Sequence, residues 1–312
     1  MKIFGAISIT VIILVILYFL ICFLVFRKIF AREKNISKTE EEFYNNNDKQ
    51  IGEKIKSAKD NFGKYKFRRV RIYASDEAEL TGRLYAAQEN TRTVILCHGY
   101  KSFPEFDFGL VIDEYAEKGY NVLVIDERAH SRSGGKYTTL GISEAYDIVM
   151  WCIWAELNFG TGCSVTLHGV SMGAFACLVA AANPEIPKNV EKVVADSMYE
   201  SVMCIVERQI RSLFSFLSPL VLKTVNMYFR TFAGCDIRDF SLVKILPRIK
   251  IPVLFLHCGQ DGIFSPEEAE KLSTFAAGRK TLKIIPEAKH GLSFAYDEEG
   301  CRKVLSDFLS EK

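Results

Sequence analysis

Six short apolar runs, separated by longer segments with helical periodicity, most restrict how this 312-residue chain can fold. The runs are rich in Val, Ile and Leu without polar alternation, which is typical of strands buried on both faces of a sheet. Such strands, alternating with helices, predict an α/β fold with a mostly parallel central sheet. The predicted strands are residues 93–99, 120–126, 163–169, 190–196, 251–259 and 281–288, and the predicted helices are residues 106–118, 142–158, 172–183, 265–275 and 293–310.

Two further segments belong to this α/β domain. Residues 67–86 alternate apolar and polar side chains on either side of Asp76-Glu77, which predicts an opening β-hairpin. Residues 198–245 are too long for a structureless loop between two strands, so we expect a helical insertion there. Its apolar stretch, residues 210–232, allows two interpretations: a lid over a site, or helices that pack on the body.

The first 28 residues have a separate character. From Phe4 to Phe26 no residue is charged, and a helix of this length is long enough to cross the apolar core of a bilayer. A cleaved signal peptide is the alternative, but it would have a shorter apolar region and small residues before the cut. Here Arg27 and Lys28 follow the apolar stretch directly. We therefore expect an uncleaved transmembrane anchor at residues 1–28.

A polar connector, residues 29–66, joins this anchor to the predicted α/β domain at residues 67–312. It contains "EEFYNNNDKQ" and many lysines, which is typical of a solvated linker or a short charged helix. The Asn35-Ile36-Ser37 triplet is a glycosylation acceptor only if this side of the membrane is secreted.

Charge and cysteine content predict the side of the membrane. Lys2 is the only charged side chain before the apolar span, and five basic residues follow it, so the positive-inside rule places the domain in the cytoplasm. Nine cysteines without a disulfide pattern also favour a reducing compartment. The opposite side stays an alternative, because large domains translocate regardless of charge. The basic residues are Arg27, Lys28, Arg32, Lys34 and Lys38.

Neither nucleic acid nor a metal is expected as a partner. Lys and Arg number 40 against 38 Asp and Glu, so there is no basic field that would attract nucleic acid. The cysteines lack metal-ligand spacings such as C-x-x-C.

The run "VTLHGVSMGAFACLVAA", residues 165–181, leads from a predicted strand into a predicted helix. It contains a G-x-S-x-G motif centred on Ser171. A serine on such a turn, at a helix N-terminus that favours negative charge, is the arrangement of a nucleophile elbow. Gly169 and Gly173 lack side chains that would clash there. An ordinary glycine-rich turn has the same pattern, so the assignment depends on finding a base and an acid.

A serine hydroxyl needs a base that takes its proton and a third group that orients the base. His290 follows the last predicted strand in a polar loop, whereas His257 lies inside an apolar strand as a core residue. Asp261 follows the preceding strand at the same sheet edge, and the order Ser171, Asp261, His290 is that of the α/β hydrolases. Asp196, at the end of an earlier strand, is the reserve acid. The alternatives are a turn cap for Asp261 and a surface position for His290.

An oxyanion also needs donors. The backbone N–H of Met172, directly after the serine, is one predicted donor. The second is expected in the loop after residues 93–99, where His98-Gly99 permits a tight turn and Tyr100 supplies the N–H. The Tyr100 ring is a candidate for lining the site.

Over residues 67–312 the chain resembles α/β-hydrolase-fold serine hydrolases. It is most similar to the bacterial membrane-anchored group related to the serine aminopeptidase and monoacylglycerol-lipase-like branch. The family loop that matches residues 126–137 is structural, so it receives no catalytic role, although Ala129 and Ser131 stand here at its glycine positions. The matching segments are "HGY" (98–100), "DERAHSRSGGKY" (126–137), "GVSMGA" (169–174), "GQDGIF" (259–264) and "KHG" (289–291).

Together these features predict a membrane-anchored serine hydrolase that cleaves a carboxylic ester, without a cofactor. The apolar insertion favours a lipid-like substrate with a hydrophobic acyl chain. A serine peptidase or aminopeptidase on short peptides is the first alternative, although no charged anchor for a peptide terminus is evident. A non-catalytic hydrolase-fold scaffold is the second. The fold itself does not select the substrate, because it serves esters, thioesters and amides alike.

Overall fold

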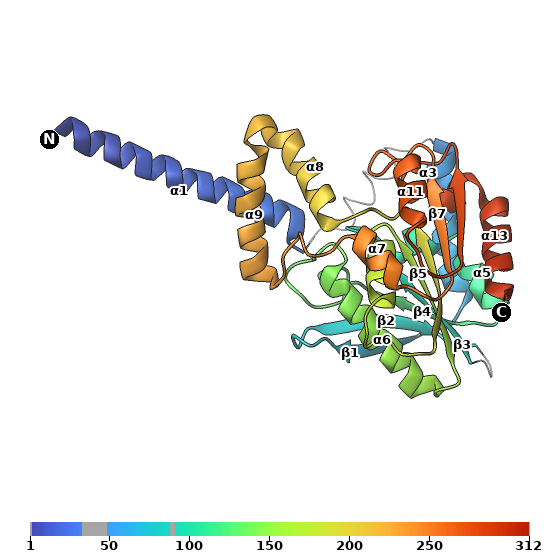
Figure 1. The fold of residues 1–312 in the computed structure, drawn as a ribbon. Coiled ribbons are helices and arrows are strands. Elements are labelled where there is room, and N and C mark those ends of the chain that lie inside the picture. Colours follow the sequence, from blue (N-terminus) through green and yellow to red (C-terminus); the bar gives the residue numbers. More distant parts are fainter. Residues whose placement is uncertain (1, 33–48, 88–90, 312) are drawn as a thin grey trace.

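The computed structural model describes residues 2–32, 49–87 and 91–311. Eight strands form one sheet in the order β1-β2-β4-β3-β5-β6-β7-β8 (Figure 1). β1 and β2 form the predicted hairpin and β2 is antiparallel to β4, whereas the other neighbouring pairs are parallel. The predicted α/β fold is therefore confirmed. The strands are β1(Arg68–Tyr73), β2(Glu79–Tyr85), β3(Arg92–Cys97), β4(Asn121–Ile125), β5(Ser164–Val170), β6(Val190–Asp196), β7(Val253–Cys258) and β8(Lys280–Ile285).

Helices cover both faces of this sheet (Figure 1). Consecutive residues of β3, Ile95 and Leu96, are fully buried in two different core clusters, one on each face. This explains why the strand has no polar alternation. The helices are α1(Lys2–Phe30), α3(Lys49–Ala58), α4(Pro104–Phe108), α5(Ile112–Glu117), α6(Ile142–Phe159), α7(Met172–Ala181), α8(Val202–Phe214), α9(Ser218–Ala233), α10(Leu242–Ile245), α11(Pro266–Ser273), α12(Ser293–Tyr296) and α13(Glu298–Ser310), with 3₁₀ turns η1(Lys59–Lys64), η2(Ser215–Leu217) and η3(Leu246–Arg248).

Two predicted helices are each divided in two. The segment predicted as residues 106–118 consists of α4 and α5, and the one predicted as residues 293–310 consists of α12 and α13. The second division is at Asp297, whose side chain accepts a hydrogen bond from the Gly300 N–H and so caps α13. Apolar periodicity alone does not register such breaks.

The predicted helical insertion is a hairpin of α8 and α9 that projects from the body (Figure 1). Ser201 begins it as an N-cap, because its side chain accepts from the Cys204 N–H. Phe229 and Val225 of α9 are fully buried. The hairpin tip has the opposite character, since Phe216 is 85% exposed.

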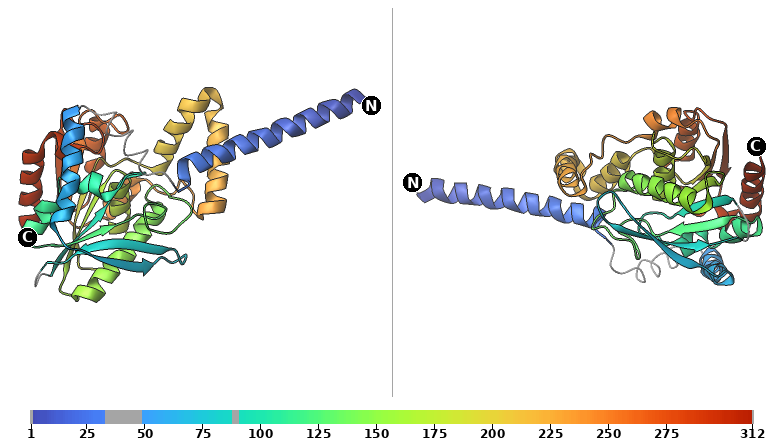
Figure 2. Two further views of the ribbon diagram at one scale, coloured as in Figure 1. Left: turned by 180° about the vertical axis from the view of Figure 1, so that it is seen from behind. Right: turned by 90° about the horizontal axis from the view of Figure 1, so that it is seen from below.

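The N-terminal helix α1 extends beyond the predicted anchor into the body. Cys22, Phe26 and Phe30 are fully buried, and the Phe30 ring lies 4.6 Å from that of Phe229 on α9. The first half of α1 stands clear of the other elements in every view (Figure 2). One end of this helix is therefore part of the core, while its first half projects from the body.

Part of the predicted connector also packs on the body. Ile55 of α3 and Phe62 of η1 are buried, and Lys54 Nζ lies 2.9 Å from a Glu298 carboxylate oxygen. Residues 33–48, which include the Asn35-Ile36-Ser37 triplet, lie outside the described residues.

The turn between β5 and α7 requires glycine for space. A Cβ on Gly173 would lie 1.9 Å from the Cys97 carbonyl oxygen, and a Cβ on Gly169 would lie 2.2 Å from the Gly173 carbonyl carbon. Neither partner can yield, because both are backbone atoms. The start of α7 is therefore pressed directly against β3 and the end of β5.

We expect Gly173→Ala to lower the free energy of unfolding by about 3 kcal/mol or more, since overpacking against backbone forces the elements apart. Thermal or denaturant unfolding measures this. Gly63→Ala is the matched control, because no atom lies within 4 Å of its added Cβ. Equal stabilities for the two variants would contradict this account of the turn.

Candidate active site

Ser171 lies at the junction of β5 and α7 in a strained backbone conformation. Its φ is 54° and its ψ is −111°, a combination that side-chain-bearing residues rarely adopt. The turn is held by the Ser171 N–H, which donates to the Asp196 carbonyl at 2.8 Å, and by the first bond of α7, from Phe175 N–H to the Ser171 carbonyl. The side chain is thereby presented at the carboxyl edge of the sheet.

His290 and Asp261 lie at the same edge, in the loops that follow β8 and β7. His290 Nε2 is 2.8 Å from Ser171 Oγ, and His290 Nδ1 is 2.7 Å from Asp261 Oδ2. The Asp261 side chain is fully buried, whereas that of His290 is 19% exposed. Hydroxyl, imidazole and carboxylate thus form one continuous hydrogen-bonded row, with the imidazole in the middle.

The environment of Asp261 favours its charged form. Burial by itself raises the pKa of this carboxyl, but the hydrogen bond and charge of His290 and two backbone N–H groups outweigh it, so the pKa falls below its usual value. The backbone donors are Ile263 and Phe264, at 2.7 and 3.0 Å from Oδ1. A carboxylate held ionised in this way can orient an imidazole and balance its positive charge.

The reserve acid, Asp196, has other partners. Its Oδ1 accepts from the hydroxyls of Ser197 and Ser293, at 2.8 and 2.7 Å. Burial raises its pKa to about 6, and the two hydroxyl bonds only partly offset this. Asp196 therefore supports the neighbouring loops, and the structure brings Asp261 rather than Asp196 to His290.

The two residues predicted as oxyanion donors flank Ser171. Met172 is the first residue of α7, and Tyr100 follows Gly99, whose Cβ position would lie 3.4 Å from Ser171 Cβ. The Tyr100 hydroxyl donates to the Ile29 carbonyl of α1 at 2.5 Å. The ring therefore reaches toward the end of α1, a placement that the sequence did not indicate.

Two buried histidines connect the loop after β3 to the loop after β4. His98 Nε2 accepts from the Glu127 N–H and His130 Nε2 accepts from the Lys101 N–H, each at 3.0 Å. Both roles require an unprotonated nitrogen, and burial lowers the pKa of both histidines, that of His98 to about 3. His168 and His257, which lie inside β5 and β7, are also buried, and His257 is a core residue as predicted.

The loop over residues 126–137 has left-handed backbone at two residues that are not glycine. Ala129 and Ser131, at the family's glycine positions, have φ of 59° and 40°. Left-handed backbone is the reason that glycine is favoured there, so this chain keeps the conformation at some cost in strain.

Asp107 lies near the site, and no sequence motif pointed to it. Its Oδ2 accepts from the Gly99 N–H at 2.7 Å and its Oδ1 from the Ser102 hydroxyl at 2.8 Å. Burial raises its pKa to about 7, with the two hydrogen bonds acting in the opposite direction. Asp107 holds the turn that carries Tyr100 against Ser171. Only the fold places this α4 side chain there, because no motif includes it.

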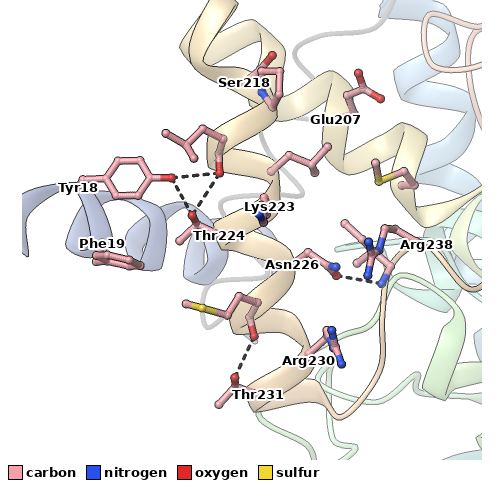
Figure 3. Close-up of a pocket in the computed structure, with 16 residues that line it drawn as sticks. Tyr18, Phe19, Glu207, Ser218, Lys223, Thr224, Asn226, Arg230, Thr231 and Arg238 are labelled. Atoms are coloured by element: carbon pink, nitrogen blue, oxygen red, sulfur yellow. Dashed lines mark hydrogen bonds between the residues drawn. The ribbon is translucent and has the colours of Figure 1, made fainter. Parts of the chain in front are cut away.

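A cavity of about 1040 Å³ lies outside this site, between α1, α8 and α9 (Figure 3). Tyr18, Leu220 and Thr224 are among its lining residues, and Ser171, Asp261 and His290 are not. No cluster of three or more His, Cys, Asp or Glu with metal-ligand geometry occurs in residues 2–32, 49–87 and 91–311.

Comparison with known proteins identifies the family. A family model described as X-Pro dipeptidyl-peptidase (S15 family) matches residues 31–206, which is more than half of the chain. The chain belongs to this S15 family. Together with esterase structures of the same fold, this membership shows that the chain is a serine hydrolase. The finer branch expected from the sequence motifs stays a prediction.

Several relatives share most of their length with this S15 family member. The uncharacterized protein YqkD of Bacillus subtilis (strain 168) is 25% identical over 231 residues, 74% of this chain and 75% of the relative. The Pyrococcus furiosus esterase Pf2001 is 25% identical, with a TM-score of 0.65 over 80% of this chain and 92% of that one. Est1E of Butyrivibrio proteoclasticus, solved with ferulic acid, is 19% identical, with a TM-score of 0.58 over 77% and 97%.

We expect Asp107→Asn to lower kcat about tenfold with little change in KM, because an amide has only one accepting oxygen for the Gly99 N–H and the Ser102 hydroxyl, so that one bond of about 1.5 kcal/mol no longer holds the Gly99 turn. Steady-state kinetics on an activated ester measures this. Asp113→Asn is the control, since Asp113 also accepts two hydrogen bonds, here from the Lys64 and Tyr65 side chains and away from the site. An unchanged kcat with only a stability loss would reduce Asp107 to a structural role.

Proposed function

We propose that this chain is a membrane-anchored serine hydrolase that cleaves a carboxylic ester through an acyl-enzyme. Ser171 Oγ attacks the carbonyl carbon while His290 Nε2 takes its proton, and Asp261 orients the imidazole and balances its charge. The N–H groups of Met172 and Tyr100 stabilise the oxyanion. His290 then protonates the leaving alcohol, and water, activated by the same imidazole, releases the acid and restores Ser171.

The hydrogen-bonded row from Ser171 to Asp261 is the observation that carries this proposal. Its two distances, 2.8 and 2.7 Å, are those of a base within reach of its proton and an orienting group within reach of the base. It also counts against a non-catalytic scaffold, which has no need to keep the serine in a strained turn beside an imidazole.

The hydrogen bonds and raised pKa values of the aspartates near Ser171 favour an ester over an X-Pro peptide as the substrate. A dipeptidyl-peptidase must bind the free α-amine of its substrate, for which an ionised carboxylate is the natural partner. Asp107 and Asp196 lie near Ser171, but both are occupied by internal hydrogen bonds and burial raises both pKa values. The esterase neighbours point in the same direction, whereas the S15 family keeps a peptidase as the alternative.

The evidence for a membrane anchor is the length and apolar character of α1. Residues 7–30 are long and apolar enough to cross a membrane, by length and composition. A cleaved signal peptide meets the same criterion, but cleavage after it would remove Phe26 and Phe30 from the core, where both are fully buried. We place the domain on the cytoplasmic side, on the basic residues that follow the span, of which Lys34 and Lys38 lie outside the described residues.

We expect Ser171→Ala and His290→Ala each to lower kcat by several orders of magnitude, and the double variant to be little worse, because the residues act as a unit. Fluorophosphonate labelling and ester turnover measure this. We expect Asp261→Asn to lower kcat strongly and Asp196→Asn to lower it only slightly. Additive losses in the double variant, or the reverse order of the two aspartates, would reject these roles.

We expect longer acyl esters to be cleaved better than acetyl esters, by up to about fourfold in kcat/KM for each buried methylene, which corresponds to about 0.8 kcal/mol. A series of nitrophenyl esters from acetyl to decanoyl, beside an X-Pro nitroanilide, measures this. Ser171→Ala supplies the blank for each substrate. Faster turnover of the X-Pro amide than of every ester would favour the peptidase instead.

A further inference from the structure

The helix α9 crosses the second half of α1 (Figure 1) and contacts it over several turns, from Tyr18 to Phe30. Tyr18 Oη is 2.7 Å from Thr224 Oγ1 and donates to the Leu220 carbonyl at 3.1 Å (Figure 3). Further along, the Phe23 ring is 5.4 Å from that of Tyr228. We call this contact, from Tyr18 to Phe30 on α1, the α1–α9 seam.

The part of α1 that precedes the seam is too short to cross the hydrocarbon core of a bilayer by itself. Residues 4–17, which precede the seam, extend over about 21 Å at a rise of 1.5 Å per residue, whereas the hydrocarbon core is about 30 Å thick. The charged Lys2 side chain, which precedes this segment, enters the hydrocarbon core only at a high cost in free energy. Tilting increases the length that is needed. If α1 spans the membrane, Tyr18 and the residues just after it lie in the near leaflet, together with the part of α9 beside them.

The hairpin has the surface that this position requires. Its tip consists of large apolar side chains that are 47 to 85% exposed in the described structure, although the hairpin base is packed on the body. An exposed apolar cluster of this size is unusual on a surface that faces only water. The tip residues are Leu213, Phe216, Leu217 and Leu220, with exposed fractions of 54, 85, 47 and 54%.

The charges of the hairpin fit a phospholipid surface. Residues 201–234 carry four basic side chains and one acidic side chain, and Lys223 and Arg230 are exposed on α9. Long basic side chains on an amphipathic helix extend to the headgroup level while their apolar neighbours enter the acyl region. A net positive charge also attracts anionic lipids.

We propose that the α8–α9 hairpin is immersed in one leaflet of a phospholipid bilayer beside α1, with its apolar tip among the acyl chains. This inference rests on the proposed membrane anchor. It also orients the candidate active site relative to the membrane, because two loops of the site are hydrogen-bonded to these helices. The Tyr100 hydroxyl donates to the Ile29 carbonyl of α1. Arg208 of α8 donates to the Gly262 carbonyl, next to Asp261, at 2.8 Å. A lipid-like ester then reaches Ser171 from the leaflet and not from bulk water.

Quenching of introduced tryptophans by brominated lipids tests this position. The full chain is reconstituted in vesicles of phosphatidylcholine and phosphatidylglycerol whose acyl chains carry bromine, as Phe216→Trp, Leu14→Trp and Leu157→Trp variants. Leu157, on α6, is the matched control, since it is 79% exposed on the body. The wild-type protein supplies the background from the native tryptophans.

We expect the added fluorescence of Phe216→Trp and Leu14→Trp to fall about twofold relative to unbrominated vesicles, because both indoles lie within acyl-chain depth. That of Leu157→Trp should not change. If the fluorescence of Leu14→Trp is quenched and that of Phe216→Trp is not, the hairpin is not immersed, although the anchor still is. This is also the result expected if a second copy of the chain, and not lipid, covers the tip. Absence of quenching at Leu14→Trp would overturn the anchor and this inference together.

Discussion

The approach of α7 to β3 at Gly173 is the contact on which the rest of the site depends. A Cβ at position 173 would lie only 1.9 Å from the Cys97 carbonyl oxygen, so the first turn of the helix requires glycine there. This approach places Ser171 in a turn directly beside Gly99, at the edge where β7 and β8 also end. Parallel strands then bring His290 and Asp261 to Ser171, because the carboxyl ends of these strands all lie at the same edge of the sheet.

Two buried carboxyls near one imidazole are distinguished by their donors. Asp261 receives two backbone N–H groups and the imidazole of His290, which together overcome the cost of burial and keep its pKa low. Asp196 accepts hydrogen bonds from two hydroxyls, and burial raises its pKa to about 6. Burial is common to both, so the number and kind of donors decides which carboxyl serves as a charged partner.

The end of α1 has two roles in this molecule. Its aromatic residues complete the core against α9, with Phe26 and Phe30 fully buried. Its last carbonyls accept bonds from the loop beside Ser171: the Tyr100 hydroxyl donates to Ile29 and the Lys101 ammonium to Lys28. These contacts give the body a defined orientation relative to α1. If α1 is the membrane anchor that we propose, they also set the direction from which a substrate in the membrane would reach Ser171.

The sequence by itself determined the order of strands and helices along the chain, the turn at Ser171 and the location of Asp261 and His290 after two strands, because hydrophobic periodicity and glycine spacing are local properties. Residues whose importance comes from distant partners were not predictable in this way. Asp107 became relevant only when folding placed it against Gly99, and the packing of Phe26 on α9 joins segments some two hundred residues apart. The tertiary structure decided these, since contacts between remote segments leave no pattern in either segment alone.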